Sequence, residues 1–256
     1  MKKIKQTSRS RWISLSGAFC ALLLLGAQQA HAQLQGELGI LDTSGINPAT
    51  EEAWQVGDTY RFVFVGSEDR TAESTDITVY NDWAQGLADA SALNIGSAQG
   101  VTWNIIGSTS SVDARDNTST NPNTDGTGES IFLVDGSTLI ASNYADLWDG
   151  AIDNALNLDE NGNSKSPNFA LTGTYIDGTT VADHGNRGSL GGDDSGVGVG
   201  QNGSELNEWI WRVNTSATAD TARQMFAMSD TLTVVPEASS ALFLAVVGLT
   251  MLLRRR

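Results

Sequence analysis

The sequence predicts a single α+β domain that lies between two terminal segments of different character. Short runs rich in β-branched and aromatic residues alternate with turn-forming residues, which is typical of short strands. Two stretches carry apolar residues at three- and four-residue steps, which is typical of amphipathic helices. No repeat period is found along the 256 residues. We therefore expect residues 33–233 to form one domain with two helices, short strands and long loops.

The predicted strands are short, and we expect them to pair antiparallel. Residues 60–65 (YRFVFV) form the first, and residues 209–213 (WIWRV) form another with both tryptophans on one face. Asp135-Gly136 and Asp177-Gly178 are turn signals, so an extended pair is expected around each, the second within residues 169–180. The other predicted strands are residues 101–106, 131–134, 138–140, 224–229 and 232–235.

Two amphipathic helices are expected, at residues 74–91 and 143–158. Ser74 or Thr75 is a suitable N-cap for the first helix. The apolar stripe of the first helix is Ile77, Tyr80, Ala84 and Leu87. The stripe of the second helix is Tyr144, Leu147, Trp148, Ala151, Ile152 and Ala155. Each helix should therefore pack one face against the strands.

Three stretches are predicted to be loops. Residues 33–57 are weakly patterned and should form a loop or an edge strand. Residues 108–130 are polar and should form a long loop. Residues 184–203 carry eight glycines and few apolar residues. This composition predicts an extended surface loop.

The first 32 residues have the organisation of a secretory signal peptide. Basic residues precede an apolar run at residues 12–26, and Ala30-His31-Ala32 is an A-x-A pattern that predicts cleavage after Ala32. A membrane anchor is the alternative, but the apolar run is short. Cys20 does not indicate a lipoprotein, because bulky Phe19 precedes it.

The last 23 residues, 234–256, form a second terminal segment. Residues 238–253 are 16 uncharged residues, which as a helix would span roughly 24 Å of a hydrocarbon core about 30 Å thick. The segment can still insert with its arginines at the interface. Arg254, Arg255 and Arg256 favour a cytoplasmic C-terminus, which places the domain outside. An ordinary buried helix would not explain this terminal arginine triplet.

The segment between these ends is strongly acidic and has no cysteine. It holds 29 acidic and seven basic residues, a formal charge of −22, whereas the whole chain has −15. Such a charge repels nucleic acid and anionic membranes, so nucleic acid is excluded as a partner. Cations are the natural counterpart, although acidity also keeps exported proteins soluble. Removal of Cys20 with the signal peptide leaves no disulfide and no thiolate chemistry.

The C-terminal segment resembles a PEP-CTERM sorting signal. The resemblance rests on Val235-Pro236-Glu237, the apolar stretch after it and the terminal Arg254-Arg255-Arg256, with Ala238 in place of the usual second proline. It implies bacterial export, transient anchoring in the inner membrane and processing by an exosortase-type protease. It also implies delivery to the cell envelope or an extracellular polysaccharide matrix.

The central segment resembles the endostatin-like branch of C-type-lectin-like domains. The resemblance lies in the order of YRFVFV, the first helix, VTWNII, IFLVDGSTLI and NYADLWDGAI. It implies two helices that flank short strands, with a long irregular loop region. The usual cysteines and the lectin calcium motifs are missing, so no carbohydrate site is implied with the fold.

Oxygen-rich loops are candidate calcium sites, because hard cations prefer carboxylate and amide oxygens. One group is Asp113, Asp116, Asn117 and Asp125, and a second is Asp159, Asn161 and Asn163, while Asp193 and Asp194 lie in the glycine-rich stretch. The second group begins like an EF-hand, but Ser164 and Ala170 stand where glycine and glutamate are required. Solvated loop polarity is the alternative for each group. That at least one of these groups binds calcium is a hypothesis, and no other cofactor is indicated.

Catalytic patterns are weak. His184 is the one histidine after the signal peptide and lies in the glycine-rich stretch, where a base is hard to position. There is no G-x-S-x-G elbow, and nothing selects a carboxylate pair for a glycan hydrolase. Most tryptophans sit at periodic apolar positions and are expected in the core, with Trp83 the best candidate for exposure to a sugar.

Three functions are therefore compatible with the sequence. The first is a non-enzymatic envelope or matrix protein that binds polysaccharide or another surface component. The second is a structural matrix protein whose acidic surface collects cations. The third is a secreted carboxylate-dependent glycan hydrolase. The export signals favour the first two over catalysis.

Overall fold

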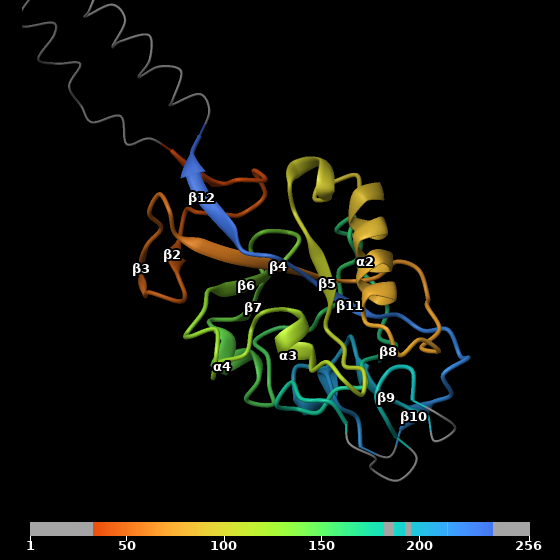
Figure 1. Cartoon of the computed structure of the whole chain (residues 1–256). Helices are drawn as coiled ribbons and strands as arrows, with labels where there is room; N and C mark the ends of the chain where they lie inside the picture. The colour runs from red at the N-terminus through yellow and green to blue at the C-terminus, as the bar shows by residue number, and fades with distance from the viewer. Residues whose placement is uncertain (1–32, 182–186, 193–195, 214, 238–256) are drawn as a thin grey trace, which may run out of the picture. The chain divides into compact units, whose positions relative to one another are not determined.

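The computed structural model describes residues 33–181, 187–192, 196–213 and 215–237 (Figure 1). Leu34–Pro236 form one compact unit, and Gln33 and Glu237 lie outside it. The signal cleavage residues Ala30 and Ala32, the apolar segment 238–253 and Arg254–Arg256 lie outside the described residues. Within the part that is described, no helix is long and apolar enough to cross a membrane.

The unit has a mixed α+β fold, as predicted, built on a seven-stranded sheet in which β4 (Thr59–Val65) is central. β11 (Phe226–Ser229) and β12 (Leu232–Pro236) follow one another along one edge of β4. The remaining strands are β1 (Leu34–Gly36), β5 (Trp103–Ile105), β6 (Ser130–Leu133) and β7 (Leu139–Ala141). Six of these strands correspond to predicted ones, and β1 is the predicted edge strand.

The prediction of antiparallel pairing throughout is wrong at one strand pair. β6 runs parallel to β4, with Tyr60 opposite Ser130 and Val63 opposite Leu133. Parallel neighbours need a long crossover, and the 64 residues between them, which include helix α2, provide it. The β6–β7 hairpin forms as predicted at Asp135-Gly136, where Gly136 adopts a φ of 75°.

β4 is buried on both faces and divides the hydrophobic core in two. Tyr60, Phe62 and Phe64 contribute to one core cluster, whereas Val63 and Val65 contribute to the other. This split follows from the alternation of side chains along a strand. Residue 61 is therefore on the side of the second cluster, although it is an arginine.

Helix α2 (Thr78–Ala90) covers the first core cluster and protects the free edge of β5 (Figure 1). Asn81 Oδ1 accepts the Ile105 N–H at 3.0 Å, and Gln85 Oε1 accepts the Trp103 N–H at 2.9 Å. These bonds use the donors that an exposed edge strand would offer to another chain. Asp76, rather than Ser74 or Thr75, accepts the N–H of the first turn.

The predicted second helix is much shorter than residues 143–158. Asn143 caps α4 (Tyr144–Leu147), in which Tyr144 and Leu147 are buried in the second core cluster. The helix ends because Gly150 has a φ of 106°, and Asp149 Oδ1 accepts the N–H of Ala151 in a tight turn. The apolar period continues beyond the helix because Trp148, Ile152 and Leu156 are buried from an irregular segment.

The glycine-rich stretch is not wholly a surface loop, contrary to the prediction. Residues Val197–Gln201 form β9, the central strand of a three-stranded sheet with β8 (Phe169–Leu171) and β10 (Ser216–Ala217). A Cβ on Gly198 would lie 2.9 Å from Trp211 Cζ3, and one on Gly200 would lie 2.0 Å from the Trp209 carbonyl oxygen. Glycine is present here because the tryptophan segment packs directly on the strand backbone.

That tryptophan segment is not the predicted strand. Residues Asn207–Trp209 form the 3₁₀ turn η2, and the Trp211 N–H bonds to the Asn207 carbonyl. Trp209 and Trp211 are buried from this turn, whereas Val213 is 55% exposed. The alternating apolar pattern of residues 209–213 thus belongs to a helical turn, from which Trp209 and Trp211 pack against β9.

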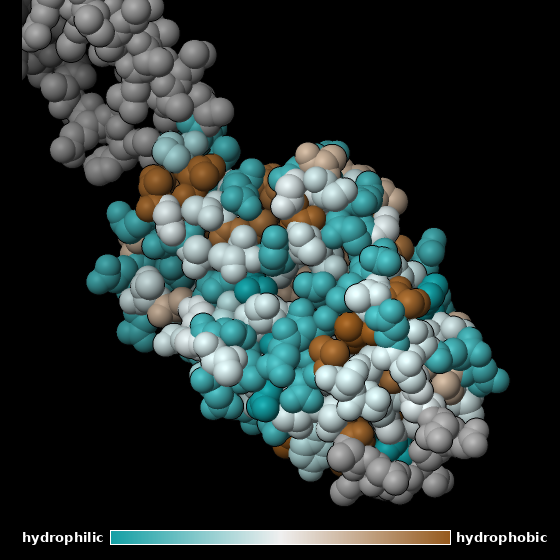
Figure 2. Space-filling model, viewed as in Figure 1, coloured by the Kyte–Doolittle hydropathy of each residue, from teal (hydrophilic) through white to brown (hydrophobic). Residues whose placement is uncertain are grey.

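The remaining elements are short. β2 (Ile46–Asn47) and β3 (Glu52–Ala53) form a separate hairpin, and α3 (Ala114–Asn117) and η1 (Ser97–Gln99) are single turns. On the face drawn in Figure 2, apolar residues form small groups separated by polar ones. The large exposed apolar residues are Ile46, Val56, Tyr175, Leu206 and Val213.

Candidate functional site

The first predicted calcium group is engaged in local hydrogen bonds around α3. Asp113 Oδ1 accepts the Thr180 N–H at 2.7 Å, and its other oxygen lies 3.8 Å from Arg115. Asp116 accepts the Asn121 side-chain amide at 2.7 Å. Asp125 accepts the Asn121 backbone N–H at 2.8 Å. Asp116 and Asp125 thus stabilise the segment around Asn121, whereas Asp113 connects α3 to the segment at Thr180.

The second predicted calcium group forms a closed turn. Asp159 is 5% exposed, and its Oδ1 accepts the N–H groups of Asn161 and Asn163 at 3.0 and 2.9 Å. Asn161 in turn accepts the Ala92 N–H at 2.9 Å and so ties the turn to the end of α2. Among the described residues, no three His, Cys, Asp or Glu side chains are grouped to hold a metal ion.

Asn117 and the tryptophans also have roles in packing. The Asn117 amide donates to the Ile105 carbonyl at 2.9 Å and pairs with Asn81, which holds α3 against β5 and α2. Trp83 is half-buried, and a Cβ on Gly66 would lie 2.4 Å from its ring. The other described tryptophans are at most 6% exposed, as predicted. Asp193, Asp194 and His184 lie outside the described residues.

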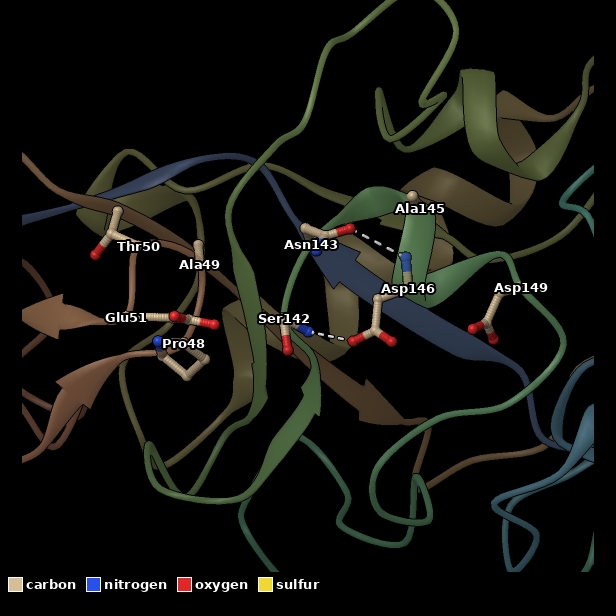
Figure 3. A pocket seen from close by; sticks show the side chains of 9 residues that line it. All are labelled: Pro48, Ala49, Thr50, Glu51, Ser142, Asn143, Ala145, Asp146 and Asp149. Carbon is tan, nitrogen blue, oxygen red and sulfur yellow. Dashed lines mark hydrogen bonds between the residues drawn. The ribbon is translucent and has the colours of Figure 1, made fainter.

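A polar pocket of about 660 Å³ lies between the β2–β3 turn and the start of α4 (Figure 3). The carboxylates of Glu51 and Asp146 lie on opposite sides of Ser142, and Asp149 lies beyond Asp146 (Figure 3). The lining residues are Pro48, Ala49, Thr50, Glu51, Ser142, Asn143, Ala145, Asp146 and Asp149. This pocket is the candidate functional site.

The wall from the β2–β3 turn is held by Asn47, which is 2% exposed. Its side-chain oxygen accepts the Ala49 N–H at 3.0 Å, and its carbonyl accepts the Glu51 N–H at 2.9 Å. Ser130 of β6 donates to the same side-chain oxygen at 3.3 Å, which ties the turn to the main sheet. Glu51 has a φ of 58°, a left-handed conformation that is uncommon outside glycine. The turn thus fixes where the Glu51 side chain emerges.

The opposite wall is formed by a capped helical turn. Asn143 Oδ1 accepts the Asp146 N–H at 3.1 Å, and Asp146 Oδ2 accepts the Ser142 N–H at 2.6 Å. Burial and the charges of Asp146 and Asp149 raise the pKa of the neighbouring Asp153. The negative charges of Asp146 and Asp149 therefore also affect a residue that does not line the pocket.

A buried arginine, Arg61, stabilises this wall through a hydrogen bond to Tyr144 of α4. Arg61 is 5% exposed and donates to Glu129 at 2.7 Å and to the Tyr144 hydroxyl at 3.1 Å. Its other nitrogens bond to the Thr118, Ser119 and Ser229 carbonyls and to the Thr231 hydroxyl. Burial raises the pKa of Tyr144 to about 12. The hub that Arg61 forms connects β4 to α4 and to the β11–β12 turn.

The pocket offers hydrogen-bond acceptors and negative charge without an aromatic platform or a histidine. Its oxygens can accept hydroxyl or ammonium donors. None of its residues was singled out from the sequence. The available signal was the cap pattern Asn143-x-x-Asp146, and nothing local paired it with residues 48–51. No protein-family model matches the chain, and no curated protein matches its sequence.

Proposed function

We propose that this chain is an exported bacterial envelope or matrix protein that binds polysaccharide without catalysing a reaction. The observation that carries the proposal is the pocket itself, in which two fixed backbone turns present acceptor oxygens around a shared volume. Sugar hydroxyls are good donors to such oxygens, and a volume of about 660 Å³ suits a small ligand unit.

We further propose that the unit is a C-type-lectin-like domain of the endostatin-like branch. The support is that α2 and α4 pack on the two core clusters that β4 separates, so helices flank the sheet. Long irregular connections between β7 and β11 add support. The second helix is only one turn, which is a departure from that pattern.

The proposed location rests on the two ends of the chain. The sequence of residues 1–32 supports export, and Val235-Pro236-Glu237 with the apolar segment and arginines supports a PEP-CTERM-type tail. An exosortase-type protease is the proposed processing partner, and the membrane is reached through residues 238–253. The final location is the envelope or an extracellular matrix.

Cation binding is the second candidate function, and the acidity of the exported segment favours it. Glu51, Asp146 and Asp149 line one volume within a segment of formal charge −22. Calcium would be the expected ion, because hard cations prefer oxygen ligands. A cation could also bridge these carboxylates to a glycan.

A glycan array probed with the full chain, with and without calcium, tests the proposal. Glu51→Gln and Asp146→Asn should weaken glycan binding, because each replaces a charged acceptor with a weaker one. Asp82→Asn, at an exposed position of α2 that does not line the pocket, removes the same charge and should leave binding unchanged. Calorimetry with calcium alone tests the second candidate. Failure to bind any glycan in either condition would refute polysaccharide binding.

A further inference from the structure

Arg70 and Arg223 lie directly opposite one another on two neighbouring extended segments. Arg70 donates its backbone N–H to the Arg223 carbonyl at 2.7 Å, and Arg223 returns the bond at 3.0 Å. In such an antiparallel pair, opposite side chains leave the same face with Cβ atoms about 4.5–5.5 Å apart. The Arg70 and Arg223 side chains therefore leave the backbone at adjacent positions on the same face.

In the part of the chain that the structure describes, neither arginine forms an ion pair. The ion pairs there are Arg61–Glu129 and Arg115–Asp113. Glu68, Asp69 and Glu73 flank Arg70 in sequence, yet none of them forms an ion pair with either arginine. The Nε atoms of Arg70 and Arg223 are shielded from solvent and have no hydrogen-bond acceptor.

We expect this arrangement to be unfavourable when no anion is bound. Like charges directly opposite on paired strands repel each other, and a buried donor without an acceptor loses its hydration without compensation. The exported segment has 29 acidic residues for seven basic ones, so carboxylate partners are plentiful elsewhere. An external anion held between the two guanidinium groups would offset this repulsion.

We propose that Arg70 and Arg223 form a binding site for a single oxyanion of the carboxylate or phosphate class. Guanidinium groups present planar pairs of donors that match the oxygens of such anions. The net charge of −22 opposes a densely charged polyanion, so the ligand carries one isolated anionic group. Two sources fit: a uronic acid unit in an otherwise neutral glycan, which rests on the proposed polysaccharide function, or free inorganic phosphate, which does not.

The test is a thermal shift of the full chain in detergent at low ionic strength. Sodium glucuronate, inorganic phosphate and neutral glucose are titrated separately against the wild type, Arg70→Gln and Arg223→Gln. Arg212→Gln is the matched control, because Arg212 already contacts Gln201 and lies 5.1 Å from the Phe169 ring centre. We expect glucuronate or phosphate to stabilise the wild type and the control, and affinity to fall at least about tenfold in both pair variants.

The comparison of the two anions identifies the source, and either one supports the site. A response to phosphate with no glycan binding on the array would support the site while refuting the polysaccharide function. Stabilisation by neither anion, or equal stabilisation of Arg70→Gln and Arg223→Gln, would overturn the proposal. Without anion, both variants should melt at or above the wild-type temperature, because the repulsion is relieved. Lower melting of both would show purely structural arginines and would also overturn it.

Discussion

Replacing Arg61 with methionine removes the connection between β4 and the wall of the pocket. Methionine has a similar length and fills much of the same volume, but it has no donor. Glu129, which is 8% exposed, would lose its charged donor and keep the Thr231 hydroxyl at 2.6 Å. The Thr118 and Ser229 carbonyls would lose bonds of 2.9 and 3.0 Å.

The expected loss of stability is large because a buried charge is left without its partner. Breaking a buried ion pair on one side costs about 3–5 kcal/mol. Each orphaned carbonyl adds a penalty of up to about 1–3 kcal/mol unless water reaches it. We therefore expect Arg61→Met to lower the free energy of unfolding by at least about 4 kcal/mol. Adding Glu129→Leu should restore part of that loss, because the unpaired carboxylate is removed.

Urea unfolding followed by tryptophan fluorescence measures both variants. Arg212→Met is the control, since Arg212 is half-buried and its loss should cost less than about 1 kcal/mol. A loss below about 1 kcal/mol for Arg61→Met, at an unchanged denaturant slope, would refute the reasoning. So would a double variant that is less stable than Arg61→Met alone.

Three further predictions concern the hub, the glycine strand and the edge of the sheet. Burial raises the pKa of Tyr144 from 10.0 to about 12 in the folded state. The stability that the neutral hydroxyl contributes to the fold is therefore complete below pH 10 and is lost between pH 10 and 12. Tyr144→Phe should make the urea midpoint fall less steeply over that range. Gly200→Ala should destabilise by at least about 1–3 kcal/mol through overpacking, whereas Gly86→Ala in open space on α2 should stabilise by about 0.5–1 kcal/mol, both read from urea midpoints. Asn81→Ala should cost about 1–3 kcal/mol and promote association through β5, measured by unfolding and light scattering.

The strands of the main sheet could be predicted because their signals are local. The run YRFVFV at β4 and the Asp135-Gly136 turn between β6 and β7 carry the propensity and turn chemistry of what they form. The parallel pairing of β4 with β6 has no such local signal. This pairing depends on the long connection through α2, and no short stretch of the sequence indicates which strand that connection leads to.

Two of the wrong predictions followed local periodicity or composition where another feature determined the structure. Residues 143–158 keep a helical apolar period, yet the left-handed Gly150 ends the helix after one turn. The glycine-rich composition of residues 184–203 is typical of a loop. Gly198 and Gly200 lie in a strand, however, where the absence of a side chain makes room for Trp211 and Trp209. Glycine in a sequence does not distinguish a flexible loop from a strand under close contact.

The site was beyond sequence reasoning for a related reason. The acidic residues chosen as calcium ligands were grouped by proximity in the chain, but Asp125 and Asp159 bond to backbone N–H groups of their own turns and Asp113 bonds to the distant Thr180. The pocket instead joins residues about 90 positions apart, through bonds that Asn47 makes to Ser130 and to its own turn. Carboxylates close in sequence act on local backbone, whereas a shared cavity requires two segments that the fold brings together.

The pairing of the two ends constrains how the proposed sorting signal is processed. Leu34 lies opposite Pro236 and Gly36 opposite Val234, and Glu237 donates its N–H to the Gln33 carbonyl at 2.7 Å. A protease that binds extended backbone must therefore first detach Pro236 and Glu237 from the segment that follows the predicted signal cleavage site. Terminal edge pairs open at low free energy, and Pro236 offers no N–H to hold the strand. Leu232 and Val234 are 1% and 0% exposed, so cleavage after the motif would leave the residues that fix β12 in the core.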